Sequence, residues 1–107
     1  MIFETLYASA RRGELILTEN GFARYHLRRD GILTLHEILV TRRFCGVGTR
    51  LLGRIIEFGR DAGASCVQAK CPADLDANEW YRAKGFVLMG KERARSGREI
   101  NCWRLSL

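Results

Sequence analysis

The residue types and spacing best suited to chemistry occur in one glycine-containing stretch, RFCGVGT, near the middle of the chain. Its two glycines, Gly46 and Gly48, are separated by one residue, so the backbone can turn sharply and leave successive N–H groups without partners. At the start of a helix, such donors and the positive end of the helix dipole bind a phosphate or pyrophosphate. An ordinary glycine-containing turn is the alternative. The stretch comprises Arg43, Phe44, Cys45, Gly46, Val47, Gly48 and Thr49, and Arg43 at its mouth can add a formal charge to such a site.

The segments on either side of this loop fit a phosphate site. Residues 32–40 (ILTLHEILV) are rich in β-branched and apolar side chains, which predicts a buried strand. After the glycines, apolar residues recur at helical spacing with charged residues mostly between them. This pattern predicts an amphipathic helix that runs to about Asp61 and ends at Gly63. The expected order is therefore strand, glycine loop, helix.

The spacing within the loop excludes two common phosphate loops. A dinucleotide-binding loop has a third glycine three residues after Gly48, but that position is Leu51. An NTPase loop ends in Gly-Lys-Ser/Thr, and no lysine stands there. The pattern that remains is R-x-x-G-x-G on a strand-to-helix turn.

The other elements follow from hydrophobic periodicity and from turn residues such as glycine and proline. Before residues 32–40, we expect a helix over residues 2–10 and strands over residues 14–18 and 22–28. After the loop helix, we expect a strand over residues 65–71, a helix over about 75–84, and strands over residues 86–89 and 100–107. Asp74 or Asp76 could cap the second of these helices. The strand over residues 65–71 should run parallel to residues 32–40, because a helix connects them. The prediction is an α+β fold in one domain, residues 1–107.

Composition indicates a globular protein and leaves the partners open. The chain has 107 residues, 47% hydrophobic and 28% charged, and no apolar run approaches the roughly twenty residues that cross a bilayer. The N-terminus does not read as a secretion signal, so we expect a cytoplasmic location. The net charge of +6 favours an anionic partner, either nucleic acid, an acidic protein face or a phosphate-rich cofactor. A solvated basic surface is the alternative.

The four cysteines indicate reduced thiols. They form no C-x-x-C pair, and no histidine lies near them at ligand spacing, so a metal site is not expected. In a cytoplasmic chain, scattered cysteines of this kind remain reduced.

A second motif follows in residues 77–86 (ANEWYRAKGF). Tyr81 stands four residues before the pair Gly85-Phe86, and Ala77 lies one turn before the tyrosine. Together with R-x-x-G-x-G, this pattern resembles the GNAT N-acetyltransferase superfamily, in which the two motifs occur in this order with one strand between them. The resemblance covers roughly residues 14–107.

The resemblance implies a mixed sheet flanked by helices, with an antiparallel meander and central parallel strands that splay apart after Val40. The resemblance places acetyl-CoA in the gap, with its pantetheine arm against the backbone of Ile38, Leu39 and Val40 and with residues 43–49, from Arg43 to Thr49, around its pyrophosphate. The family has an Asn seven residues before the tyrosine. Here Asp74 takes that place and Asn78 lies a turn later, and both are candidate cofactor contacts. The N-terminal part is truncated, as in very short GNAT proteins of phage and mobile elements, which include an anti-CRISPR acetyltransferase.

Acetyl transfer to an amine requires a neutral amine, a stabilised oxyanion and a proton for the leaving thiolate. The resemblance assigns the acid role to Tyr81, and a backbone N–H near Val40 could serve the oxyanion. For the base, His36 and Glu37 compete. Strand alternation places His36 on the side of Ile38 and Val40, and Glu37 on the other side unless a bulge reorients it. A water chain without a dedicated base is the third option.

The sequence therefore predicts an acetyl-CoA-dependent N-acetyltransferase that acts on a protein lysine, a protein N-terminus or a small amine. The alternative is a non-catalytic module of the same fold, either an acetyl-CoA sensor or a basic binder of nucleic acid or protein. A nucleic-acid binder would show aromatic and arginine residues on one sheet face, and the sequence shows no such face. The short chain and its exposed sheet edges are also compatible with a homodimer.

Overall fold

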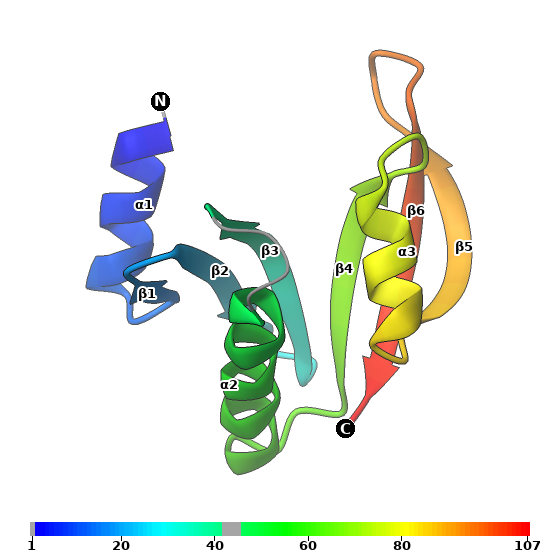
Figure 1. The fold of residues 1–107 in the computed structure, drawn as a ribbon. Coiled ribbons are helices and arrows are strands. Elements are labelled where there is room, and N and C mark those ends of the chain that lie inside the picture. The colour runs from blue at the N-terminus through cyan, green and yellow to red at the C-terminus, as the bar shows by residue number, and fades with distance from the viewer. Residues whose placement is uncertain (1, 42–45) are drawn as a thin grey trace.

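The computed structural model describes residues 2–41 and 46–107, and Figure 1 shows its fold. Each helix and strand predicted from the sequence is present in these residues. In chain order the elements are α1 (Ile2–Arg11), β1 (Leu15–Thr18), β2 (Gly21–Leu27), β3 (Ile32–Val40), α2 (Val47–Asp61), β4 (Cys66–Pro72), α3 (Ala77–Ala83), β5 (Val87–Arg93) and β6 (Glu99–Ser106).

The six strands form one mixed sheet in the order β1-β2-β3-β4-β6-β5. The β1, β2 and β3 strands form an antiparallel meander, and β3 pairs in parallel with β4. On the far side, β6 lies between β4 and β5 and runs antiparallel to both. The α+β mixed sheet expected from the sequence is thus confirmed.

Two boundaries near α3 differ from the prediction. The helix begins at Ala77 rather than near Leu75, because Leu75 belongs to a turn in which its N–H donates to the carbonyl of Pro72 at 3.1 Å. The β5 strand begins at Val87 and runs to Arg93, well past Met89. All of its residues are exposed, so it has no buried alternation that could reveal its length in the sequence.

The parallel strands β3 and β4 separate at their carboxyl ends. They pair only from Ile32 with Cys66 to Leu35 with Ala69, and beyond these pairs they diverge (Figure 1). The splay therefore begins after Leu35, earlier than the predicted position after Val40. The physical reason is a β-bulge, which bends a strand and increases its twist.

The bulge lies at His36. Two consecutive residues of β2, Tyr25 and Arg24, pair with Leu35 and Glu37 of β3, which leaves His36 as the extra residue. The insertion of one residue shifts the alternation of side chains between the faces of the sheet. Beyond the bulge, Ile38 packs against the core.

The core lies between the sheet and the helices α2 and α3. Leu51, Leu52 and Ile55 of α2 are buried and belong to the same apolar cluster as Leu33 and Leu35 of β3. This cluster continues to Trp103 of β6 and to Tyr81 of α3. The α2 helix, between the two parallel strands in the sequence, is thereby fixed against the sheet with its first turn beside the splay (Figure 1).

The N-terminal helix α1 lies beside β1 and β2 (Figure 1). It is amphipathic in sequence, but Phe3 and Tyr7 are 76% and 61% exposed, whereas Ser9 is fully buried. Within the described residues, none of the helices is long and apolar enough to cross a membrane.

Candidate active site

A cleft of about 690 Å³ opens where β3 and β4 diverge. The carboxyl-terminal half of β3, the first turn of α2, the end of β4 and the start of α3 form its walls. The lining residues that the sequence analysis had assigned to the site are His36, Glu37, Ile38, Leu39, Val40, Gly46, Val47, Gly48, Thr49 and Tyr81. The predicted contacts at Arg43, Phe44 and Cys45 lie outside the described residues.

The first turn of α2 borders this cleft, and the N–H groups at a helix start have no partner within the helix. The residue before the helix, Gly46, has a left-handed conformation with φ of 73°, and among the described residues no side chain caps the helix. The first turn also contains no acidic residue. The N–H groups of this turn and the positive end of the helix dipole can therefore bind an anionic ligand.

Gly48, in the first turn of α2, lies directly beside Trp80. A Cβ atom at this position would lie 3.4 Å from Cζ2 of Trp80, so the indole ring packs directly over the helix backbone. Trp80 also lines the cleft. From the sequence, Trp80 could be either core or pocket wall, and the local pattern gave no signal that separates the two.

The carboxyl-terminal part of β3 forms the other wall. Beyond Leu35 the strand is paired with β2 but not with β4. The backbone of Ile38, Leu39 and Val40 therefore borders the cleft with one edge that lacks a partner strand. An extended ligand with amide groups can hydrogen-bond to such an edge.

The Tyr81 side chain lies at the inner end of the cleft and is only 7% exposed. Its ring contacts Phe86 and Trp80 edge to face, with centroids 5.2 and 5.3 Å away. Burial, together with the nearby Cys71 thiol, raises the pKa of Tyr81 to about 12, so the phenol stays protonated near neutral pH. Its hydroxyl makes no hydrogen bond within the described part of the chain, which leaves it able to donate to a ligand.

His36 and Glu37 border the cleft on β3, but His36 does not share a face with Ile38 and Val40. Its ring stacks with that of His26 at 6.5 Å, and His26 lies on the opposite face of β2 from the buried Tyr25. The expected placement of His36 is thus wrong, because the bulge inserts it as an extra residue before Ile38.

The charges around His36 favour its neutral form. Partial burial lowers the pKa of His36 below its ordinary value, and the positive charge of Arg24 lowers it further. Glu37 forms an ion pair with Arg24, with 2.8 Å between Oε1 and Nη2. Beyond this pair, the carboxylate of Glu14 contacts His26. A neutral imidazole at the edge of the cleft can accept a proton.

Asp74 and Asn78 do not line the cleft. Asp74 binds Arg98 through two hydrogen bonds of 3.2 Å, and Asp76, at the N-cap of α3, makes no side-chain capping bond. The capping role predicted for either aspartate is therefore wrong.

The Asn78 side chain is satisfied by protein groups. Its amide donates to the carbonyls of Pro72 and Leu75, and its oxygen accepts from Asn101 and Trp103, all at 2.8–3.0 Å. Sequence analysis missed this network, because nothing local in the chain indicates that Asn101 and Trp103 lie beside α3.

Comparison with known proteins agrees with the architecture. The model of the acetyltransferase (GNAT) family matches residues 6–86. A candidate streptothricin acetyltransferase from Bacillus anthracis, solved with acetyl coenzyme A, has a TM-score of 0.77 at 18% identity, over 85% of this chain and 59% of that one. A nourseothricin acetyltransferase has a TM-score of 0.74 at 27% identity, over 81% and 57% of the two chains.

A candidate acetyltransferase from Agrobacterium tumefaciens has a TM-score of 0.72 at 24% identity, over 97% of this chain and 85% of that one. No curated protein matches the sequence. The chain spans about three fifths of the length of the streptothricin and nourseothricin enzymes.

The splayed mixed sheet, with a glycine turn leading into α2, is an architecture that this chain shares with these acetyltransferases. Because the family model matches most of its length, this chain belongs to the acetyltransferase (GNAT) family. An origin in phage or mobile elements stays a prediction.

Proposed function

We propose that this protein is an acetyl-CoA-dependent N-acetyltransferase that transfers an acetyl group to a protein lysine, a protein N-terminus or a small amine. The observation that carries the proposal is the cleft itself. It combines a helix start with free N–H groups, an unpaired strand edge and a buried, protonated Tyr81.

The residues of the cleft fit the coenzyme. The backbone from Gly46 to Thr49 would bind the pyrophosphate, together with Arg43, Phe44 and Cys45. The free edge of residues 38–40 would pair with the amide groups of the pantetheine arm. Bound acetyl-CoA supplies an activated thioester. Asp74 and Asn78 are left out of the proposed site, because their polar atoms are engaged by other parts of the protein.

Tyr81 would act as the general acid. Its phenol is protonated over the whole physiological range, and a donor without a partner in the described residues is available to a developing thiolate. His36 is the preferred base, since it is neutral near pH 7 and lies at the cleft edge. Glu37 is held by Arg24, and a water chain is the remaining route.

Titration calorimetry with acetyl-CoA, with NADH as a control dinucleotide, tests the binding part of this proposal. Selective binding of acetyl-CoA would support it, and an acceptor screen should then begin with lysine-rich proteins. Binding without transfer to any amine would favour the sensor, and no binding would leave a basic binder of nucleic acid or protein.

Tyr81→Phe tests the catalytic part. The substitution keeps the ring contacts and removes the hydroxyl, so we expect turnover to fall on the order of 10²-fold while acetyl-CoA affinity stays nearly intact. Full activity in this variant would remove Tyr81 as the acid.

A further inference from the structure

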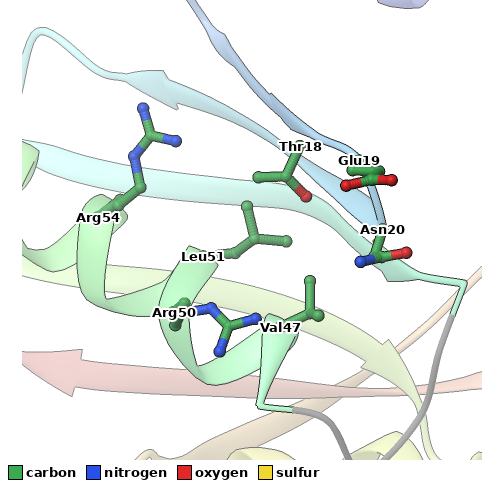
Figure 2. Close-up of a pocket in the computed structure, with 7 residues that line it drawn as sticks. All are labelled: Thr18, Glu19, Asn20, Val47, Arg50, Leu51 and Arg54. Atoms are coloured by element: carbon green, nitrogen blue, oxygen red, sulfur yellow. The ribbon is translucent and has the colours of Figure 1, made fainter.

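A second cavity, of about 340 Å³, lies on the β1–β2 side of α2 (Figure 2). Its walls are the turn between β1 and β2 on one side and the first two turns of α2 on the other. The cavity shares Val47 with the cleft but has its own polar groups. The lining residues are Thr18, Glu19, Asn20, Val47, Arg50, Leu51 and Arg54.

The helix side of this cavity is cationic with an apolar floor. Arg50 and Arg54 stand one turn apart on α2 and line the cavity across from the β1–β2 turn, with their guanidinium groups pointing in different directions (Figure 2). Neither guanidinium has a hydrogen bond or ion pair with another residue that the structure describes. Between them and the sheet, Val47 and Leu51 are 5% and 1% exposed. Two unpaired guanidinium groups over an apolar floor suit an organic anion, because arginine binds phosphate and carboxylate with paired N–H donors.

The turn side of the cavity is held in place and offers hydrogen-bonding groups. The main-chain carbonyl of Asn20 accepts from both the N–H and the hydroxyl of Thr41, at 2.8 and 3.1 Å. The Thr18 hydroxyl donates to the carbonyl of Gly21 at 3.0 Å, so only its lone pairs face a ligand. The carboxylate of Glu19 and the side-chain amide of Asn20 complete this wall. The wall therefore accepts hydrogen bonds and can donate one.

We propose that this cavity binds a small phosphate monoester, with its phosphate bound by the arginines of α2, Arg50 and Arg54, and its hydroxyl or amino groups toward Glu19. A liquid water molecule takes about 30 Å³, so the cavity has room for roughly ten waters. Inorganic phosphate alone would leave most of that space unfilled and Glu19 facing an anion. A ligand that also carries hydrogen-bond donors satisfies both walls. A free nucleotide or sugar phosphate has this chemistry, and so does the 3′-phosphate end of coenzyme A.

Amide chemical shifts of the folded protein, titrated with adenosine 3′-monophosphate, test the proposal without assuming any enzymatic activity. We expect shifts confined to residues 18–20 and 47–54. Arg54→Gln should weaken the affinity about tenfold or more. Glu19→Gln should weaken it several-fold, because the carboxylate that accepts from the ligand's hydroxyl or amino groups is removed. Arg60 is an exposed residue of α2 outside the cavity. Arg60→Gln removes the same charge as Arg54→Gln and should leave the affinity unchanged.

Weakening by Glu19→Gln separates a built site from general attraction to a basic protein, because loss of a negative charge would strengthen general attraction of an anion. Equal weakening in Arg54→Gln and Arg60→Gln, or no shifts at residues 18–20 up to millimolar ligand, would overturn the proposal. Strengthening by Glu19→Gln would also contradict the assigned arrangement.

A second arm identifies the source of the phosphate and rests on the proposed function. If coenzyme A supplies it, the wild type should bind coenzyme A about tenfold more tightly than 3′-dephospho-coenzyme A, and Arg54→Gln should lose that preference. Equal affinities, with adenosine 3′-monophosphate still bound at residues 18–20, would assign the cavity to a separate metabolite. Failure to bind either coenzyme contradicts only the proposed function, because the first titration does not depend on it.

Discussion

The Asn78 side chain joins α3 to β6 and to the end of β4, and its removal should destabilise the fold. Its amide donates to the carbonyls of Pro72 and Leu75, both at 2.8 Å. Its oxygen accepts from Nδ2 of Asn101 at 3.0 Å and from Nε1 of Trp103 at 2.8 Å. Asn78→Ala removes all four hydrogen bonds together.

The size of the effect follows from what is left unpaired. Trp103 and Asn101 are 1% and 7% exposed, so water reaches their freed donors poorly. A buried donor without a partner costs about 1–3 kcal/mol. The carbonyl of Leu75 still accepts from the Asn78 N–H, so that side loses less. We therefore expect Asn78→Ala to lower the free energy of unfolding by about 2–4 kcal/mol, a large part of the roughly 5–15 kcal/mol typical of a domain.

Urea denaturation followed by far-UV circular dichroism measures this difference as a shift in midpoint at constant slope. Glu79→Ala is the matched control. This neighbouring side chain is 81% exposed and pairs with Arg82 only at 3.7 Å, so the change should stay within about 0.5 kcal/mol. If Asn78→Ala stayed within about 1 kcal/mol of wild type but lost acetyl-CoA affinity, Asn78 would be a cofactor contact and the structural assignment would be refuted.

Three further predictions concern the cleft and the sheet edge. Gly48→Glu should abolish acetyl-CoA binding in calorimetry, because the side chain meets Trp80 and repels the pyrophosphate. Gly53→Glu, in open space on the same helix, is the control and should bind acetyl-CoA normally. Unchanged affinity of Gly48→Glu would disprove the assignment of the loop to the pyrophosphate. Because the pKa of His36 is lowered from its ordinary 6.5, kcat/KM should rise with pH through a value below 6.5 and level off near neutrality. His36→Gln should remove that acidic limb, and a persisting limb would assign the base to another group. Met89 is 59% exposed on β5, an edge strand of the sheet, and this edge is a candidate for dimer formation. Analytical sedimentation should then show a dimer, and a monomer at micromolar concentration would reject the homodimer.

The elements with strong periodicity were predictable from sequence, and the features that depend on contacts across the sheet were not. Residues 32–40 carry enough apolar and β-branched side chains to predict the β3 strand with the bounds that are observed. The helical spacing after Gly48 predicts α2 equally well, because its buried face is continuous. In contrast, Asn78 sits in a helix whose local pattern carries no trace of Trp103, which lies 25 positions later in the chain.

The bulge at His36 shows why strand periodicity alone misplaced a site residue. Simple alternation puts residues 36, 38 and 40 on one face of β3. The register with β2 skips one residue at His36, so the alternation of side chains between the two faces of the sheet restarts there. His36 and Ile38 therefore lie on opposite faces. A bulge depends on the pairing of two strands, and no residue type in ILTLHEILV requires one.

The same bulge accounts for the position of the cleft. A strand in the middle of a sheet normally pairs along both edges, because an unpaired buried backbone group costs free energy comparable to a lost hydrogen bond. Beyond Leu35, β3 keeps its bonds to β2 but loses β4, so the backbone of residues 38–40 must be satisfied by water or by a ligand. A rigid extended molecule with amide groups displaces that water at little conformational cost to the protein, because β2 already holds the edge in place. The bulge thus exchanges sheet pairing for a prepared binding edge beside the free N–H groups of α2.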